Sequence, residues 1–188
     1  MTIELPDITT RAATEGLLDV AYATHDTPVG TLLLARTARG LARIAYLDPG
    51  EEEAVLIDLA GRLSPRVLRA PRELDQPRRE LEEYFAQRRQ RFDLEIDWRL
   101  ARGFGRKVLA AASRIPYGSV STYMRLASEA GSPRAARAAG NALGTNPLPI
   151  VIPCHRVLHS SGGLGGYTGG LERKRALLEV EGALNAAL

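Results

Sequence analysis

Cysteine is nearly absent from this sequence, which has one, at position 154, among its 188 residues. A single cysteine excludes an intramolecular disulfide and fits a reducing compartment. It also excludes a Cys-x-x-Cys pair for zinc, and the three histidines (His25, His155 and His159) make no convincing metal site on their own. We therefore expect a protein that needs no metal and no other cofactor.

A long hydrophobic run is missing from the start of the chain. Residues 1–7 are acidic and contain no apolar stretch, which indicates neither a signal peptide nor a membrane-spanning segment. With 45% hydrophobic residues, the chain still has enough apolar material for a real core and one or two small domains. These features together predict a soluble, cytoplasmic protein.

Lysine is scarce as well, with 2 residues against 23 arginines, and the charges are unevenly placed. Residues 1–98 carry 13 arginines and 18 acidic residues, a net charge of −5, whereas residues 99–188 carry 12 basic and 4 acidic residues, a net charge of +8. A basic half beside an acidic half suggests that one face meets a polyanion. Solvated surface arginine is the alternative, and charge alone does not choose between them.

The first half of the chain has the pattern of a small α/β domain. Stretches of alternating residues separated by turns predict an antiparallel meander, at residues 17–24, 31–36 and 41–47. Helices are expected from Glu51 onward and over residues 77–89, and a closing strand over residues 92–97. We therefore predict a structural domain over residues 1–97, with a small antiparallel sheet, helices and no evident chemistry.

The second half, residues 98–188, reads as a mostly helical domain. A helix that carries Tyr123 ends near Gly131, and Ser132 as N-cap with Pro133 at the first helical position predicts another helix over residues 133–143. Two helices joined across a glycine, the second one basic, have the outline of a helix-turn-helix. We expect this domain to be winged and to bind DNA.

The helix expected over residues 133–143 has a surface made almost entirely of alanine, from which Arg134 and Arg137 protrude. Small side chains let a helix backbone approach a nucleic-acid groove closely, and arginines supply charge or a wedge. The alternative is a helix packed tightly against its neighbour through alanines, with its arginines in solvent.

Cys154 is expected at the end of a short buried strand over residues 150–152, where a lone cysteine is more often a small hydrophobe than a nucleophile. Two features favour the nucleophile. His155 is adjacent, and the glycines of residues 162–170 leave space for a flat substrate. Because successive strand residues point to opposite faces, contact between Cys154 and His155 needs a turn of the chain or a bridging water.

Glu181 adds a third feature, because it lies on the apolar face of a helix expected over residues 171–181. A carboxylate on such a face should be paired, and a histidine is an obvious partner. The alternative for Glu181 is a frayed helix end with the side chain in water.

Several motifs in residues 101–182 resemble the active-site domain of the O6-alkylguanine-DNA alkyltransferases, also called methylated-DNA–protein-cysteine methyltransferases. The Pro-Cys-His-Arg-Val core at residues 153–157 is highly specific for that family. The turn at residues 27–30 resembles the family more weakly. The other matching stretches are residues 115–118, 135–138, 146–147, 166–170 and 181–182.

The resemblance implies DNA repair by direct, irreversible transfer of a methyl or larger alkyl group from O6-alkylguanine to Cys154, in a single turnover. O4-alkylthymine is left open as a further substrate. His155 would be the general base through a water, and Glu181 would hold and polarise it. Asn146 would tie the turn beneath the active-site strand. Tyr123 would donate to N3 of guanine, so that the base leaves neutral.

The resemblance also implies how the substrate is held. The backbone N–H of Thr168 would donate to O6, and the carbonyls of Cys154 and Val157 would accept from the exocyclic amine. Arg137 would enter the duplex in place of the extruded nucleotide. The phosphate contacts would come from Ser132 and Ser160, and Tyr123 would also touch the DNA. The expected partner is double-stranded DNA that contains O6-alkylguanine, bound by a monomeric protein.

Three other functions compete with this interpretation. A damage-recognition protein would bind alkylated bases without transfer, although such proteins of similar sequence lack the cysteine that this chain has. A cysteine hydrolase would use Cys154 and His155 for many turnovers and would give no role to Arg137 or Tyr123. A plain helix-turn-helix regulator would bind undamaged DNA and would be indifferent to the loss of Cys154.

Overall fold

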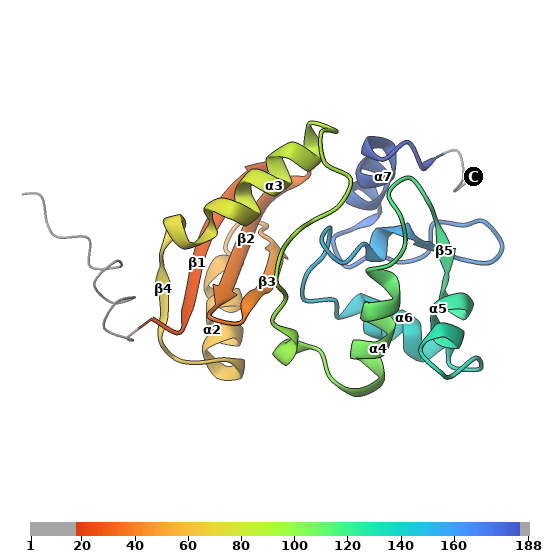
Figure 1. The fold of residues 1–188 in the computed structure, drawn as a ribbon, viewed down its shortest axis with the longest axis horizontal. Helices are drawn as coiled ribbons and strands as arrows, with labels where there is room; N and C mark the ends of the chain where they lie inside the picture. The colour runs from red at the N-terminus through yellow and green to blue at the C-terminus, as the bar shows by residue number, and fades with distance from the viewer. Residues whose placement is uncertain (1–17, 185–188) are drawn as a thin grey trace, which may run out of the picture. The chain divides into compact units, whose positions relative to one another are not determined.

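The computed structural model describes residues 18–184, so the expectation for residues 1–7 lies outside the described part of the chain. The chain divides into two compact units. Figure 1 colours the chain from red near its N-terminus to blue near its C-terminus. The first unit contains residues up to 80 together with residues 94–97, and the second contains residues 81–93 and the chain from residue 98 onward. No helix within residues 18–184 is long and apolar enough to cross a membrane.

The first unit is built on a four-stranded mixed sheet with the strand order β3-β2-β1-β4. Strands β1 (Val20–Thr27), β2 (Gly30–Thr37) and β3 (Gly40–Tyr46) form the antiparallel meander that the alternation predicted. A short strand that the sequence did not reveal, β4 (Val67–Arg69), pairs parallel to β1. The small sheet with helices is therefore confirmed, with one parallel edge strand added.

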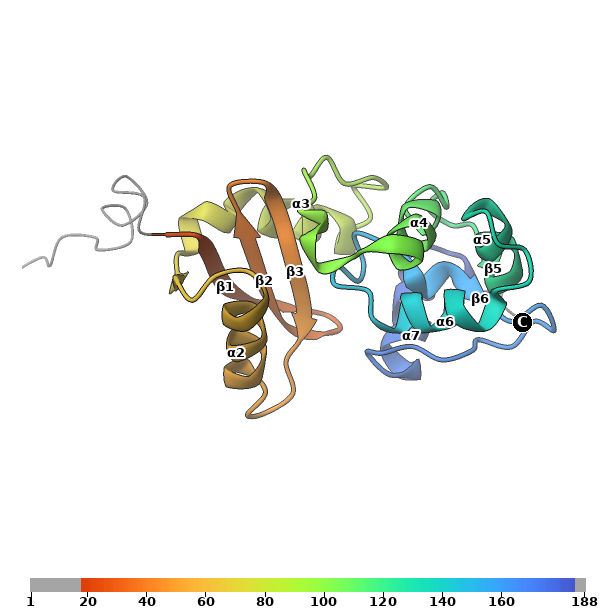
Figure 2. The same ribbon diagram turned by 90° about the horizontal axis from the view of Figure 1, so that it is seen from below.

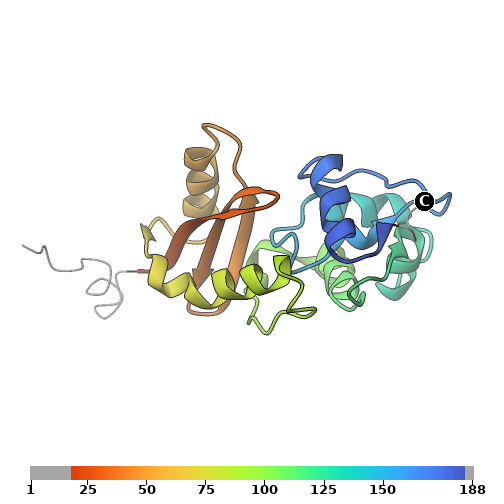
Figure 3. The same ribbon diagram turned by 90° about the horizontal axis from the view of Figure 1, so that it is seen from above.

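The core of this unit surrounds β2, in which residues 32–35 are all buried. Because successive strand residues point to opposite faces, both faces of the sheet must be covered. Figure 3 shows helices α2 (Glu52–Arg62) and α3 (Asp75–Phe85) on either side of the strands. A 3₁₀ helix, η1 (Pro71–Leu74), leads into α3. The two units divide within α3, so the boundary at residue 97 remains a prediction.

The closing strand predicted over residues 92–97 is wrong. The segment makes a single parallel bridge, between Ile96 and Leu41 at the start of β3. The Leu41 amide donates to the Glu95 carbonyl (2.8 Å) and the Asp97 amide donates to the Leu41 carbonyl (2.9 Å). The Asp97 carboxylate then accepts from the Thr37 hydroxyl at 2.7 Å. The segment is therefore held by a single β-bridge and a side-chain hydrogen bond, and it does not form the continuous hydrogen-bond ladder of a strand.

The second unit is mostly helical, as predicted, and Figure 2 shows its helices coloured from green to blue. A short 3₁₀ helix, η2 (Trp98–Leu100), precedes helix α4 (Gly103–Ala112). Helices α5 (Tyr123–Glu129) and α6 (Ala136–Gly144) pack against each other and against α4. A two-stranded parallel sheet joins β5 (Ser121–Thr122) to β6 (Val157–Leu158), and α7 (Leu171–Val180) closes the unit.

The helix-turn-helix outline is present in α5 and α6, but the start predicted for the second helix is wrong. Residues 132–135 form a turn in which the Ala135 amide donates to the Ser132 carbonyl at 2.9 Å, and α6 begins only at Ala136. Pro133 explains the error, since proline suits the second position of a turn as well as the first turn of a helix.

The buried strand predicted over residues 150–152 is also wrong. The segment is a turn, in which Ile150 has a φ of 75° and the Ile152 amide donates to the Leu148 carbonyl at 2.8 Å. Ile150 and Ile152 are buried and Val151 is partly exposed, and none of the three is paired in a strand. Cys154 consequently begins a 3₁₀ helix, η3 (Cys154–Arg156), which places Cys154 and His155 on a helical turn.

Candidate active site

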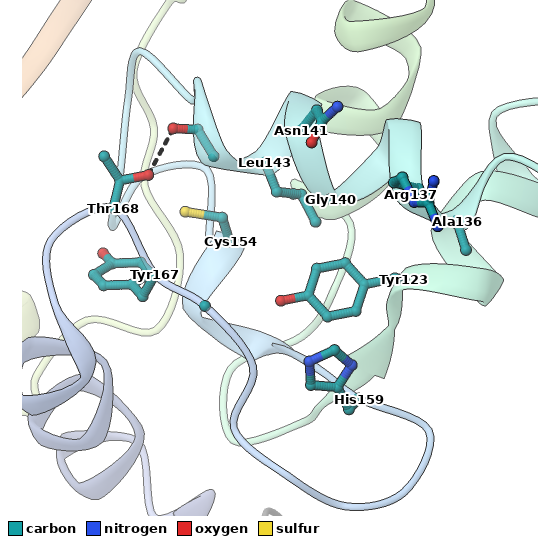
Figure 4. A pocket seen from close by; sticks show the side chains of 12 residues that line it. Tyr123, Ala136, Arg137, Gly140, Asn141, Leu143, Cys154, His159, Tyr167 and Thr168 are labelled. Atoms are coloured by element: carbon teal, nitrogen blue, oxygen red, sulfur yellow. Dashed lines mark hydrogen bonds between the residues drawn. The ribbon is translucent and has the colours of Figure 1, made fainter.

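Cys154 lies on the wall of a pocket of about 610 Å³ in the second unit (Figure 4). The pocket is bounded by α6 on one side and by the loop of residues 159–168 on the other. Tyr123 projects into it from the start of α5, with its hydroxyl pointing to the interior. The lining is completed by Ala136, Arg137, Gly140, Asn141, Leu143, Gly144, His159, Gly166, Tyr167 and Thr168.

The Cys154 thiol is held by Asn146, whose side-chain amide donates to Sγ at 3.1 Å. The same amide nitrogen donates to the carbonyl of Ile152 at 2.8 Å, and the Asn146 Oδ1 accepts from the Leu148 amide at 3.0 Å. Burial raises the pKa of the Cys154 thiol, while the Asn146 hydrogen bond and the nearby Lys174 ammonium act to lower it. The unreacted thiol is thus kept protonated by burial, beside groups that favour its thiolate.

Behind the thiol, Glu181 lies in a buried cluster of four residues. His155 is fully buried, and its Nε2 lies 2.8 Å from Glu181 Oε1. Arg156 donates from Nε to Oε2 (2.8 Å) and from Nη2 to Oε1 (2.9 Å). The Tyr84 hydroxyl donates to Oε1 as well, at 2.7 Å. Glu181 is 5% exposed, which rules out a frayed end with the side chain in water.

The protonation of this cluster follows from its electrostatics. Burial acts to raise the pKa of Glu181, but the hydrogen bonds and charges of His155 and Arg156 outweigh it and bring the pKa to about 2. An ionised carboxylate only accepts hydrogen bonds, so His155 Nε2 carries the proton. Burial lowers the pKa of His155 against the pull of Glu181, which favours the neutral ring. His155 Nδ1 is then the basic nitrogen, and it is buried with no hydrogen-bond partner among residues 18–184.

Tyr123 is fitted closely into the pocket. Its ring lies 5.3 Å from that of His159, centroid to centroid. Burial and the neighbouring Cys154 raise the pKa of its hydroxyl, which therefore stays protonated as a donor. Gly165 has a φ of 69°, and a Cβ there would lie 2.7 Å from the Tyr123 hydroxyl. Glycine at 165 is thus needed both for the backbone conformation and for the space around the phenol.

The residues predicted to hold the base and the DNA fall into three groups. Thr168 and Arg137 line the pocket, and the Thr168 hydroxyl donates to the carbonyl of Gly144 at 2.6 Å. Val157 is buried in β6, three residues after Cys154. Ser132 and Ser160 lie outside the pocket lining, in the turn before α6 and in the loop after β6.

Three residues of the site were not assigned a role from the sequence. Arg156 belongs to the Pro-Cys-His-Arg-Val core, so its position in the motif was the available signal. Lys174 is fully buried, with Nζ donating to the carbonyls of Val157 (2.7 Å) and Leu164, and burial lowers its pKa to about 8. Its spacing of three and four residues from Leu177 and Leu178, which are buried on the same face of α7, was a signal. Tyr84 lies 97 positions before Glu181, and although the helical pattern predicted that its side chain faces inward, nothing local pointed to its contact with that carboxylate.

Within residues 18–184, no group of three or more His, Cys, Asp or Glu side chains is arranged to hold a metal ion. The polar side chains of the site are a thiol, an imidazole, a carboxylate, a phenol and an amide, together with the guanidinium of Arg156 and the ammonium of Lys174. This set suits nucleophilic attack by sulfur with proton transfer to and from neighbouring groups.

Comparison with known proteins covers both halves of the chain. Residues 103–183 match the DNA binding domain of 6-O-methylguanine DNA methyltransferase, and residues 20–98 match the ribonuclease-like domain of the same family. The methylated-DNA–protein-cysteine methyltransferase of Mycolicibacterium paratuberculosis is 40% identical over 162 residues, which are 86% of this chain and 92% of that protein.

Solved structures give the same result. The O6-methylguanine methyltransferase of Mycobacterium tuberculosis superimposes with a TM-score of 0.73 at 39% identity, over 86% of this chain and 92% of that one. The Mycobacterium tuberculosis OGT in complex with DNA gives a TM-score of 0.72 at 37% identity, over 87% of this chain and 93% of that one. Sequence and fold thus agree over almost the whole described chain.

Proposed function

This chain belongs to the 6-O-methylguanine DNA methyltransferase family, and we propose that Cys154 is the residue to which it transfers the alkyl group of O6-alkylguanine in DNA. Membership of the family makes the chain a DNA-repair methyltransferase that acts by alkyl transfer to a protein cysteine. The observation that carries the assignment is the position of Cys154, the one free thiol within residues 18–184, on the wall of the pocket and in contact with Asn146.

The thiol must lose its proton to attack. We propose that a water bridges Cys154 Sγ to the Nδ1 of His155 and passes the thiol proton to that nitrogen. The imidazolium formed would be stabilised by Glu181, which receives the Nε2–H of the same ring at 2.8 Å. Asn146 donates to the sulfur and stabilises the thiolate as it forms. The orphaned Nδ1 supports this assignment of the base.

Transfer then exchanges one bond for another. The Cys154 sulfur forms a bond to the alkyl carbon, while the bond from that carbon to guanine O6 breaks and leaves its electron pair on the base. The Tyr123 hydroxyl donates a proton to N3, so that the guanine departs neutral. The proton that His155 took from the thiol then returns through water to the Tyr123 phenolate, whose raised pKa favours the protonated form. The thioether product has no neighbouring group that could hydrolyse it. One protein molecule therefore repairs one lesion, which separates this function from that of a cysteine hydrolase.

Base recognition would use the backbone around the pocket. The Thr168 amide would donate to O6, and the carbonyls of Cys154 and Val157 would accept from the exocyclic amine. The Val157 carbonyl already accepts from Lys174, but a carbonyl has two lone pairs and can accept a second donor. Lys174 would thus hold the carbonyl in the direction that the base requires.

The DNA partner imposes a further requirement, because an O6-alkyl group lies inside the stacked duplex and must be flipped out to reach Cys154. Arg137 is exposed on α6 at the edge of the pocket, where it would fill the gap left in the duplex. The exposed Ser160 and the partly exposed Ser132 would contact phosphates. We propose that the protein does this as a monomer, in the cytoplasm, where a free cysteine stays reduced, with residues 1–97 as a structural domain.

The test is the intact mass of the protein after incubation with duplex DNA that contains one O6-methylguanine. We expect a gain of one methylene unit, mapped to Cys154 by peptide analysis and saturating at one per protein. Cys154→Ala should bind the DNA and gain nothing. No gain in the unaltered chain, with lesion binding retained, would overturn the proposal in favour of damage recognition. Many turnovers on an ester would favour a hydrolase.

A further inference from the structure

One oxygen of the Glu181 carboxylate, Oε1, accepts three hydrogen bonds, and the other accepts one. Oε1 lies 2.7 Å from the Tyr84 hydroxyl, 2.8 Å from His155 Nε2 and 2.9 Å from Arg156 Nη2, whereas Oε2 takes the Nε of Arg156 at 2.8 Å. Three donors on one carboxylate oxygen fix the direction in which its lone pairs point. His155 and Tyr84 therefore donate to the same oxygen, and the strength of the His155 hydrogen bond depends on whether the Tyr84 hydroxyl is present.

Tyr84 is itself held rigidly. Its side chain is fully buried near the end of α3. The ring packs against those of Phe85 (5.2 Å), Phe92 (5.4 Å) and Tyr117 (6.0 Å), centroid to centroid. Burial and the adjacent Glu181 raise the pKa of the Tyr84 hydroxyl, so it remains a donor at any physiological pH. The Tyr84 hydroxyl is therefore a constant hydrogen-bond donor to Oε1 of Glu181.

On the basis of the function proposed above, we infer that Tyr84 is a positioning residue for alkyl transfer: its hydroxyl holds the Glu181 carboxylate so that His155 keeps Nε2–H on Oε1 and presents Nδ1 towards the thiol. Tyr84 does not line the pocket, and its hydroxyl donates to Glu181, so it would act on the thiol through that carboxylate. It also draws negative charge away from the oxygen that His155 uses. Loss of the hydroxyl would leave that oxygen freer to turn and more strongly attractive to the His155 proton.

The charged groups around His155 determine whether loss of the Tyr84 hydroxyl raises or lowers the pKa of His155. They are Glu181, Arg156 and Lys174, with Cys154 beside it in η3, while Tyr84 and Tyr117 face the Glu181 carboxylate. Arg156 and Lys174 disfavour the protonated ring and Glu181 favours it. Removal of the Tyr84 hydroxyl strengthens the contribution of Glu181, so the pKa of His155 should rise.

The test compares Tyr84→Phe with Tyr117→Phe. Both variants lose one hydroxyl from the same aromatic cluster, but the Tyr117 hydroxyl donates to the backbone carbonyl of Val180 at 2.7 Å and not to Glu181. We expect Tyr84→Phe to lower the single-turnover rate constant on O6-methylguanine DNA about tenfold. The acidic limb of its pH–rate profile should move up by about 0.5 pH unit or more. Tyr117→Phe should leave the limb in place.

A second measurement does not depend on alkyl transfer. The ¹⁵N shifts of the ring of His155, one of three histidines in the chain, report its pKa and tautomer directly. We expect a higher pKa in Tyr84→Phe than in the unaltered protein. An unchanged histidine titration and rate profile would overturn the inference, as would a variant that only lowers the fraction of protein alkylated at the end point. Failure of the unaltered chain to become alkylated would instead count against the proposed function.

Discussion

Asn146 binds the Cys154 sulfur and the backbone beneath it with the same amide nitrogen, which lies 3.1 Å from Sγ and 2.8 Å from the carbonyl of Ile152. A turn without regular secondary structure thus delivers the reactive atom to the pocket, and one side chain ties the turn and the sulfur together. The position of the thiol and its acidity are therefore linked through a single residue.

Asn146→Ala should raise the pKa of Cys154, because the thiolate loses a hydrogen-bond donor while the burial that disfavours it remains. A hydrogen bond to a charged group is worth about 1.5–3 kcal/mol, which corresponds to an upward shift of about one pH unit or more. The pH dependence of carboxamidomethylation by iodoacetamide reports this directly, since the chain has one cysteine. A curve that coincides with that of the unaltered protein would contradict the role of Asn146.

Glu181→Gln should destabilise the fold at neutral pH, since it leaves Arg156 buried without its counter-charge. The folded pKa of Glu181, about 2, lies below its ordinary value of 4.5. The stabilisation is therefore present above about pH 4.5 and is lost as the pH falls towards 2, and it amounts to about 3 kcal/mol. Urea unfolding at pH 7 and pH 3 should show the difference between the two proteins shrinking. A constant difference would argue against the ion pair.

Lys174→Met should remove a pH dependence at the alkaline end. The folded pKa of Lys174, about 8, lies below its ordinary value of 10.5, because burial disfavours the charged form. The unaltered protein should therefore gain stability over the variant as the pH rises from 8 to 10.5, by at most about 3 kcal/mol. Chemical unfolding of both proteins across that range measures the gain. Parallel stability curves would show that the Lys174 pKa is not depressed.

Gly165→Ala should slow alkyl transfer, because a Cβ would lie 2.7 Å from the Tyr123 hydroxyl at a backbone φ of 69°. The matched control is Gly163→Ala in the same loop, where no heavy atom lies within 4 Å of an added Cβ and φ is not positive. Single-turnover rates on methylated duplex should fall at least about tenfold for the first variant and change little for the second. Equal rates would mean that the loop moves aside freely.

Arg137→Ala should weaken lesion repair in duplex DNA more than Arg134→Ala, although each change removes one positive charge from the exposed start of the α6 region. Only Arg137 lines the pocket, where it would replace the flipped base. Both variants should lower non-specific affinity by similar amounts, with a salt dependence reduced by about one unit. Transfer from free O6-alkylguanine should be unaffected in both. A similar loss of duplex repair in the two variants would show that the lost positive charge explains it, and that Arg137 does not replace the flipped base.

The turn at residues 148–153 shows where sequence patterns ceased to predict structure. The run Ile150-Val151-Ile152 has the composition of a buried strand. The flanking prolines and the positive φ of Ile150 instead close a turn by local hydrogen bonds. Pro133 misled in the same way, because one residue type serves two local structures. Short apolar runs and single prolines do not contain the information that separates these cases.

The sequence by itself determined the three strands of the meander, the mostly helical character of the second half, and the family to which the Pro-Cys-His-Arg-Val core belongs. These features are local, so periodicity and a contiguous motif are enough to express them. The pairing of Glu181 with His155 was expected from the sequence, but only the tertiary structure decided that Tyr84, Arg156 and Lys174 join them behind Cys154. Tyr84 and Glu181 are 97 positions apart, and Lys174 reaches a carbonyl 17 positions before it. Such contacts depend on how buried polar groups satisfy one another when the core closes, and that pairing leaves no local trace in the sequence.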